Sequence, residues 1–384
     1  MKIGLALSGG GVRATVFHLG VLKRIAECPG CWENISFVST VSGGSLCIAL
    51  VFEKAGRRWP NSKEFLETCL PEIRRLLTSF NLQRRYKLIL FTRPWQFLHG
   101  RAPLIAKLIR KHWGIGSSVT DMPDSPRWVI CATCYETGKS WRFSKMRMGD
   151  YIANYVKSPN FPLAKAVAAS AAVPGLIGPL RFRTAKYEWL KYSKKFGDDK
   201  SEPDIPTDPL ASHLTLWDGG VYENLGVEAL FDPQDGLRNE VDFLITSDAS
   251  KPLGIEKRRL QWGIPPYLPP FRLIDVATDQ VRAFRLRTIV GFLKQNQKAG
   301  VVLRMGNTVA GILKSAMKEP PKSWAGRDFL SDTAVQTAAG LETTLRKLTE
   351  EEYDGLFQHG YEVAEATLFA YDHLPFTSST LADK

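Results

Sequence analysis

The chain opens with Ile3-Gly4-Leu5-Ala6-Leu7-Ser8-Gly9-Gly10-Gly11-Val12-Arg13, a short apolar run followed at once by three glycines. The glycines interrupt the run, and from Val12 to Ile25 apolar residues recur at the spacing of one helix face. Pro29 and Gly30 follow the expected end of that helix. The stretch therefore predicts a buried strand over residues 2–7, a glycine-rich turn and a helix.

The same order of elements repeats further along the chain. An apolar run from Ile35 to Val41 leads into Ser42-Gly43-Gly44, and a helical pattern covers Ser45 to Ala55. Strand, turn and helix units in series are typical of parallel strands with helices packed on both faces. We therefore predict an α/β fold with three layers, α/β/α, around a mostly parallel central sheet.

The two glycine turns offer complementary chemistry. The first presents backbone amides and no nucleophile, whereas the second presents the hydroxyl of Ser42. A serine hydroxyl is a weak nucleophile at neutral pH and needs both a base and amide donors for the oxyanion. The start of the following helix supplies free N–H groups and partial positive charge, and Gly43 and Gly44 permit a sharp turn.

Simpler interpretations of both turns remain open at this point. A serine in a glycine turn is often only part of a turn. The first turn could cradle a phosphate or a dinucleotide, but it lacks the Gly-Lys-Ser/Thr of a phosphate loop, and Ala14 stands where the dinucleotide pattern has its final glycine. A serine on the next strand would also go unexplained by a dinucleotide site.

The base is best sought at Asp218. It ends the apolar run from Leu214 to Trp217 and precedes Gly219 and Gly220, so we expect its carboxylate at the edge where α/β sheets bind ligands. An aspartate bonded directly to a serine can act as base when burial raises its proton affinity. An alternative site combines Ser42, Asp248 and His359 in the chain order of α/β-hydrolases.

Four segments, in this order, resemble the patatin-like phospholipase family: Ser8–Arg13, Thr40–Gly44, Ala169–Gly175 and Asp218–Gly220. The resemblance extends from about Ile3 to Leu230. The later segments Asp279–Arg282 and His359–Tyr361 resemble bacterial members. The chain departs from the family pattern at Thr40, where the first glycine of the elbow is expected, and at Ala14.

The resemblance implies a patatin-like fold and a Ser–Asp dyad with Ser42 as nucleophile and Asp218 as base. The oxyanion hole would be formed at Gly9, Gly10 and Gly11, with Arg13 supporting that loop. Support for the elbow and for the acid turn would come from Gly43, Gly44, Gly219 and Gly220. The implied activity is hydrolysis of a phospholipid or lysophospholipid ester through an acyl-enzyme, with no metal and no cofactor.

The resemblance also divides the chain. Residues 1–230 would form the catalytic core, and residues 231–384 would complete the sheet and add helices within the same globular unit. The polar segment Arg181–Ser212 is interpreted as an inserted loop. A second alternative to the enzyme is an inactive hydrolase scaffold that binds a membrane or responds to a nucleotide.

The formal charge is +12, and it is unevenly spread. Between Ile73 and Thr120 there are ten Lys or Arg and no Asp or Glu, with aromatic residues interleaved. This composition, from Phe80 to Trp113 and again from Lys251 to Arg272, favours contact with anionic lipid, although a solvated basic face is the alternative. We expect no nucleic acid partner, and the sequence does not indicate an oligomeric state.

No apolar run approaches the roughly 20 residues of a membrane span, and no signal peptide is recognised. We therefore expect a cytoplasmic protein, peripheral at the membrane.

Two Cys-x-x-Cys pairs, at residues 28–31 and 131–134, raise the question of zinc. They lie far apart, and the second is expected in a strand, where positions i and i+3 face opposite sides, so we interpret the cysteines as buried free thiols.

Overall fold

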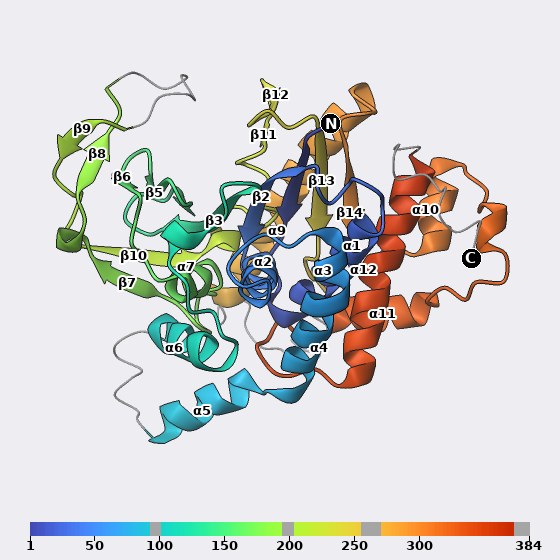
Figure 1. Cartoon of the computed structure of the whole chain (residues 1–384), viewed down its shortest axis with the longest axis horizontal. Helices are drawn as coiled ribbons and strands as arrows, with labels where there is room; N and C mark the ends of the chain where they lie inside the picture. The colour runs from blue at the N-terminus through green and yellow to red at the C-terminus, as the bar shows by residue number, and fades with distance from the viewer. Residues whose placement is uncertain (93–100, 194–202, 255–269, 372–384) are drawn as a thin grey trace.

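The computed structural model describes residues 1–92, 101–193, 203–254 and 270–371. One half of its main sheet is parallel (Figure 1). Neighbouring strands in this half are, in spatial order, β14 (Gly300–Arg304), β13 (Phe243–Asp248), β1 (Ile3–Leu7), β2 (Ile35–Val41) and β3 (Arg127–Cys134). Because these strands run the same way, the turns after β1 and β2 lie at the same edge of the sheet.

The other half of the sheet is antiparallel. It continues from β3 through β4 (Ser140–Phe143), β5 (Arg147–Asp150), β6 (Asn154–Lys157), β8 (Trp189–Lys191) and β9 (Ile205–Thr207). Strand β10 (His213–Asp218) pairs with β3 and with β7 (Leu180–Arg183). The interpretation of residues 181–212 as a loop is therefore wrong for β7, β8 and β9. These strands are short and partly exposed, so their polar composition resembles that of a loop.

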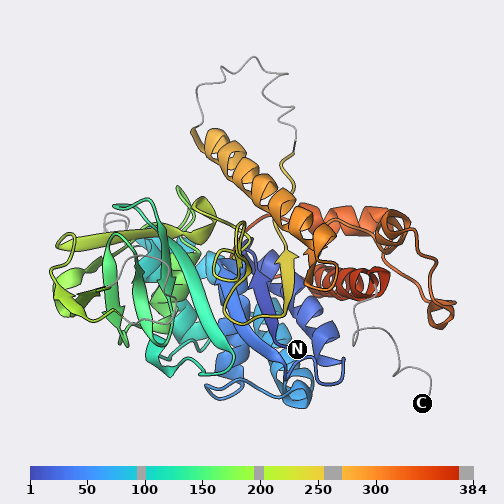
Figure 2. The ribbon, with the colours of Figure 1, turned by 90° about the horizontal axis from the view of Figure 1, so that it is seen from above.

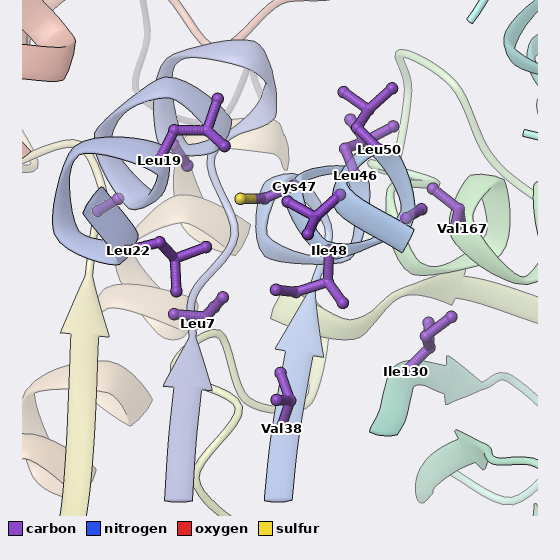
Figure 3. Close-up of a cluster of buried hydrophobic side chains, with 14 of the residues drawn as sticks. Leu7, Leu19, Leu22, Val38, Leu46, Cys47, Ile48, Leu50, Ile130 and Val167 are labelled. Atoms are coloured by element: carbon purple, nitrogen blue, oxygen red, sulfur yellow. The ribbon is translucent and has the colours of Figure 1, made fainter. Parts of the chain in front are cut away.

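Helices cover one face of the sheet. Leu7, Val38 and Ile130 point from β1, β2 and β3 into a buried cluster that Leu22 and Ile48 complete from above (Figure 3). These two residues belong to α1 (Gly11–Ala26) and α2 (Gly43–Lys54). The C-terminal helix α12 (Glu350–Ala370) packs against α1 on the same side.

The opposite face is covered by the segment after β10 and by α9 (Pro270–Gln295), which projects from the body of the molecule in Figure 2. Phe37 and Val41 of β2 belong to a second buried cluster that includes Leu286 and Ile289 of α9. Alternate residues of the central strands thus serve different layers. The predicted three-layer fold with a mostly parallel centre is confirmed.

The remaining α-helices of the described residues are α3 (Ser62–Glu64), α4 (Leu70–Ser79), α5 (Leu82–Thr92), α6 (Ala102–His112), α7 (Leu163–Ser170), α10 (Val309–Ala316) and α11 (Asp332–Gly340). Within these parts of the chain, none of the helices combines the length and the apolar character needed to cross a bilayer.

Cys28 and Cys31 are joined as a disulfide after α1, so the expectation of free thiols is wrong for this pair. Cys131 and Cys134 are free and buried.

Helices α1 and α12 approach each other through two glycines. A Cβ added at Gly20 would lie 2.0 Å from the carbonyl oxygen of Phe357, and one added at Gly360 would lie 2.0 Å from that of Phe17. Backbone therefore contacts backbone, and no side chain fits between the helices. This contact holds the C-terminal helix against the helix that starts at the glycine turn.

Alanine at either glycine should separate the two helices. We expect Gly20→Ala and Gly360→Ala each to lower the free energy of unfolding by about 1–3 kcal/mol, since the added methyl group overpacks a closed interface. Gly355→Ala on α12 is the matched control, because a Cβ there meets open space. It should be neutral or stabilise the protein by up to about 1 kcal/mol through helix propensity. Urea denaturation measures all three, and equal effects at positions 355 and 360 would contradict the contact.

Candidate active site

Ser42 lies between the end of β2 and the start of α2. Its backbone has φ 49° and ψ −109°, a region that residues with a side chain rarely occupy. Such strain persists only where surrounding contacts impose it. Here the Ser42 amide donates a 2.8 Å hydrogen bond to Ser170 Oγ, and the amide of Gly44 donates to the carbonyl of Ser8 at 3.1 Å.

A network of buried hydroxyl groups supports the backbone of the Ser42 turn through hydrogen bonds. Ser170 Oγ, at the end of α7, donates to the carbonyl of Cys131 in β3 at 2.6 Å. Ser45 Oγ lies 2.9 Å from Ser170 Oγ and 3.0 Å from Thr40 Oγ1. Thr40 Oγ1 also donates to the carbonyl of Val129. Thr40, the departure from the family pattern, thus sits in the strand and adds hydrogen bonds to this network.

The first glycine turn leaves two amides available. Gly10 has φ 143° and Gly11 has φ 61°, conformations that suit glycine. Neither amide has a hydrogen-bond acceptor among the described residues. The amide of Gly9 is different, because it donates to the carbonyl of Asn224 at 3.1 Å. Of the three predicted oxyanion-hole glycines, only Gly10 and Gly11 therefore offer a free donor.

The two glycine turns touch each other. A Cβ added at Gly43 would lie 2.4 Å from the carbonyl oxygen of Gly11 and 2.9 Å from the Cβ of Ala14. Thr15 Oγ1 is within hydrogen-bond distance of both the Gly11 and the Gly43 carbonyl oxygens, at 3.1 and 2.9 Å. The methyl group of Ala14, the second departure, fits because Gly43 has no side chain. The amide of Gly43 begins α2 and has no acceptor among the described residues either.

Asp218 ends β10 and is 5% exposed. Its Oδ1 accepts a 2.7 Å hydrogen bond from the Gly220 amide. Burial raises the pKa of Asp218 to about 7, while the Gly220 amide and the Ser42 hydroxyl act in the opposite direction. The other carboxyl oxygen, Oδ2, is buried and has no hydrogen-bond partner of ordinary geometry among the described residues. The Ser42 hydroxyl is nevertheless close enough to stabilise the ionised form of Asp218 over the protonated form.

The acid turn is also fixed through its backbone. Thr133 Oγ1 donates to the carbonyl of Asp218 at 2.8 Å. A Cβ added at Gly219 would lie 2.6 Å from the carbonyl oxygen of Cys131, and one added at Gly220 would lie 2.6 Å from Asn224 Oδ1. Both glycines therefore let the acid turn approach its neighbours closely.

The two buried histidines have structural partners. His18 Nε2 lies 2.9 Å from the carbonyl of Ser8 and Nδ1 lies 2.9 Å from Ser247 Oγ. Since a carbonyl only accepts, Nε2 carries the proton and Nδ1 accepts from the serine. His359 Nε2 accepts from the Gly306 amide at 2.9 Å. Burial lowers the pKa of each imidazole to about 4, so both are neutral near pH 7.

The alternative site of Ser42, Asp248 and His359 is not assembled. No hydrogen bond or ion pair among the described residues joins His359 to Ser42 or to Asp248. Asp248 Oδ2 instead accepts a 2.8 Å hydrogen bond from Arg282 of α9.

Arg13 is buried beneath the first glycine turn. Its guanidinium donates to the carbonyl oxygens of Ala339 and Leu341 at 3.2 and 3.0 Å, and to that of Ala249 at 3.0 Å. Burial lowers its pKa to about 10, which leaves the group charged at neutral pH. Arg13 therefore ties the start of α1 to two segments from the C-terminal part of the chain.

A cavity of about 450 Å³ opens above Ser42 and Asp218. Gly9, Gly10 and Asn224 form part of its wall, and α9 contributes another part through Thr278 and Arg282, among others. The sequence did not indicate Asn224, and it pointed to residues 279–282 of α9 by resemblance alone, without placing them at the cavity. A separate cavity of about 690 Å³ lies beside β4, β5 and β6 and contains none of the predicted site residues. The described residues hold no group of three or more His, Cys, Asp or Glu suited to a metal ion.

Comparison with known proteins identifies the family to which the chain belongs. The family model described as patatin-like phospholipase matches residues 5–231, more than half of the chain. The chain belongs to the patatin-like phospholipase family. The match covers both glycine turns and the acid turn, and it ends before α9 and α12.

The curated relatives are much longer proteins. A patatin-like phospholipase domain-containing protein of Aspergillus terreus is 26% identical over 224 residues, which are 56% of this chain and 28% of that protein. One from Neurospora crassa is 27% identical over 222 residues, or 56% of this chain and 23% of that protein. The chain thus matches only about a quarter of the length of these relatives.

A solved structure shares the fold. Human GIVD cytosolic phospholipase A2 is similar with a TM-score of 0.50 and 14% sequence identity, covering 97% of this chain and 60% of that one. At this identity the likeness shows the fold alone. It extends to the C-terminal elements that the family model does not match.

The pKa of Asp218 has a consequence for stability. Between its ordinary value of 3.8 and about 7, the folded protein keeps this carboxyl protonated while the unfolded chain ionises it, so stability falls as pH rises through this window. The full loss is on the order of 4 kcal/mol. Asp218→Asn keeps an acceptor for Gly220 and removes the charge. We expect the variant to become more stable relative to wild type from pH 5 to pH 8 in urea denaturation; a constant difference would contradict the raised pKa.

Proposed function

We propose that the chain is a lipid acyl hydrolase of the phospholipase A or lysophospholipase type that works through a Ser42–Asp218 dyad. The observation that carries the proposal is the buried carboxyl of Asp218, with a pKa of about 7, next to a serine held in a strained turn. A base is most effective when its pKa lies near the working pH. The free amides of Gly10 and Gly11 supply the second requirement, donors for an oxyanion.

In acylation, Ser42 Oγ attacks the carbonyl carbon of the lipid ester, and its proton passes to the carboxylate of Asp218. The carbonyl oxygen becomes an oxyanion that accepts hydrogen bonds from Gly10 and Gly11, with the amide of Gly43 as a further donor. When the tetrahedral intermediate collapses, the bond to the alcohol oxygen breaks. That oxygen takes the proton from Asp218, and the acyl group stays on Ser42.

In deacylation, the same groups act on water. Asp218 removes a proton from a water molecule as its oxygen attacks the acyl carbonyl, and the amides again stabilise the oxyanion. Collapse releases the fatty acid, and Ser42 Oγ recovers a proton from Asp218. The bonds and protons balance with these residues and water alone.

Substitution of the dyad tests the proposal. Ser42→Ala and Asp218→Asn should each lower kcat for a soluble ester by about a thousandfold or more. In wild type, kcat/KM should rise with pH around an apparent pKa near 7, since Asp218 must be ionised to act as base. His359→Gln, which keeps an acceptor for Gly306, is the control and should change kcat little.

Two results would contradict this assignment. A folded His359→Gln protein as inactive as Ser42→Ala would favour the three-residue alternative. A fluorophosphonate probe that fails to label wild type, with or without lipid, would favour an inactive binding protein.

Ser170 is a positioning residue in this proposal, because it accepts from the amide of Ser42 and does not line the cavity. Ser170→Ala should lower kcat by about 10- to 100-fold with little change in KM, since a small displacement of a nucleophile is costly. Ser45→Ala is the matched control; it removes a hydroxyl of the same network that does not contact Ser42 and should cost less. A Ser170→Ala effect on KM alone would contradict the role.

The proposal extends to an anionic membrane surface. In the basic segment Phe80–Trp113, α5 exposes Leu88 and Phe91, the latter at 85%. Arg101 of the same segment donates to the carbonyl of Gly175 at 2.9 Å, in the loop that follows the cavity residues Val173 and Pro174. This part of the segment therefore lies beside the site. Residues 93–100, and residues 255–269 of the second basic segment, lie outside the described residues.

A further inference from the structure

Helix α9 carries apolar side chains on its outer side. In its second half Leu286 and Ile289 are buried against the sheet, as expected of a helix packed on a core. Over residues 272–284 the order is reversed, and several apolar side chains are exposed. Leu273 is 67% exposed and Phe284 is 64% exposed, and Val276 and Val281 are exposed as well.

The exposed residues share one side of α9. Positions 273, 276, 277, 280, 281 and 284 follow helical spacing, and none of them holds a charged residue. The charged residues between positions 272 and 284 lie off this side of the helix. Arg282 bonds to Asp248 and Asp279 at 2.8 and 2.5 Å, and Asp275, although exposed, lines the cavity. Over residues 272–284, α9 therefore turns its polar side to the active-site cavity and its apolar side outward.

More exposed apolar residues surround the cavity opening. Val221 and Leu253 line the cavity and are 37% and 36% exposed, and Leu176 follows the cavity residues Val173 and Pro174 and is 58% exposed. We call this surface the apolar rim; it consists of Leu176, Val221, Leu253, Leu273, Val276, Val281 and Phe284. Large exposed apolar side chains gathered on one helix side and beside a cavity mark a site of interaction. Figure 2 shows α9 projecting from the body, and the exposed fractions of Leu273 and Phe284 show that its outer side is accessible.

We propose that the apolar rim docks on a lipid surface with the cavity opening turned toward it, α9 lying in the interface. This rests on the proposed function, since a lipid ester must reach Ser42 from a bilayer or micelle. Charge favours the same occupant. Arg287 and Lys294 lie on the outer side of α9 beyond the apolar residues, and Lys251 and Arg272 lie at the cavity. An apolar side bordered by cations is typical of a helix at an anionic lipid interface.

The test uses the double variant Leu273→Gln/Phe284→Gln, because neither residue lines the cavity or packs in the core. Val290→Gln is the matched control, because Val290 is an exposed apolar residue of the same helix that does not lie on its outer side. We would measure co-sedimentation with phosphatidylcholine vesicles with and without phosphatidylglycerol, hydrolysis of the vesicle lipid, and hydrolysis of a water-soluble short-chain ester. We expect the double variant to lose about tenfold or more in vesicle binding and vesicle hydrolysis. Its turnover of the soluble ester should stay within about twofold of wild type.

Vesicle binding equal to wild type in the double variant overturns the proposal. So does self-association of wild type, seen by sedimentation velocity, that the double variant loses while vesicle binding persists, because the occupant is then a second copy. Failure of the proposed function gives a different result from failure of the docking proposal. Soluble-ester hydrolysis that survives Ser42→Ala overturns the dyad, whereas vesicle binding lost only in the double variant still supports docking.

Discussion

The candidate site depends on the contact between two glycine turns. Strands β1 and β2 are parallel neighbours, with Leu7 opposite Thr40, so the turns that follow them meet at one edge of the sheet. The carbonyl of Gly11 lies where a side chain at position 43 would be, and Thr15 spans both turns. No residue larger than glycine fits at position 43 without separating the turns. The strained backbone of Ser42 and the free amides of Gly10 and Gly11 are set by this contact.

Burial then decides which group titrates near neutral pH. Desolvation disfavours the charged form of any group, so it raises the pKa of a carboxyl and lowers that of an imidazole. Asp218 moves to about 7 while His18 and His359 move to about 4. The same dry surroundings that would suit a carboxyl base therefore make the histidines neutral structural residues. His18, bonded to the carbonyl of Ser8, belongs to the support of the glycine turn.

The segment beyond the family match contributes to the site. Arg13 is held by carbonyl oxygens of residues 249, 339 and 341, and α9 lines the cavity through residues such as Thr278. Strand β13 pairs directly with β1, and α12 packs on α1 through Gly360. The division at residue 230 remains a prediction, but these contacts show that residues after 231 shape the surroundings of both glycine turns.

The sequence by itself determined the fold class and pointed to both glycine turns, Ser42 and Asp218, because strand alternation, helical spacing and turn chemistry are local properties of the chain. The tertiary structure alone decided the rest. The acceptor for the Gly9 amide, the bond from Ser42 to Ser170 and the strands within residues 181–212 all depend on segments far apart in sequence. The tertiary structure also decided that the apolar side of α9 faces outward. Helical spacing in the sequence shows that a helix has an apolar and a polar side, but only packing decides which of them faces the protein.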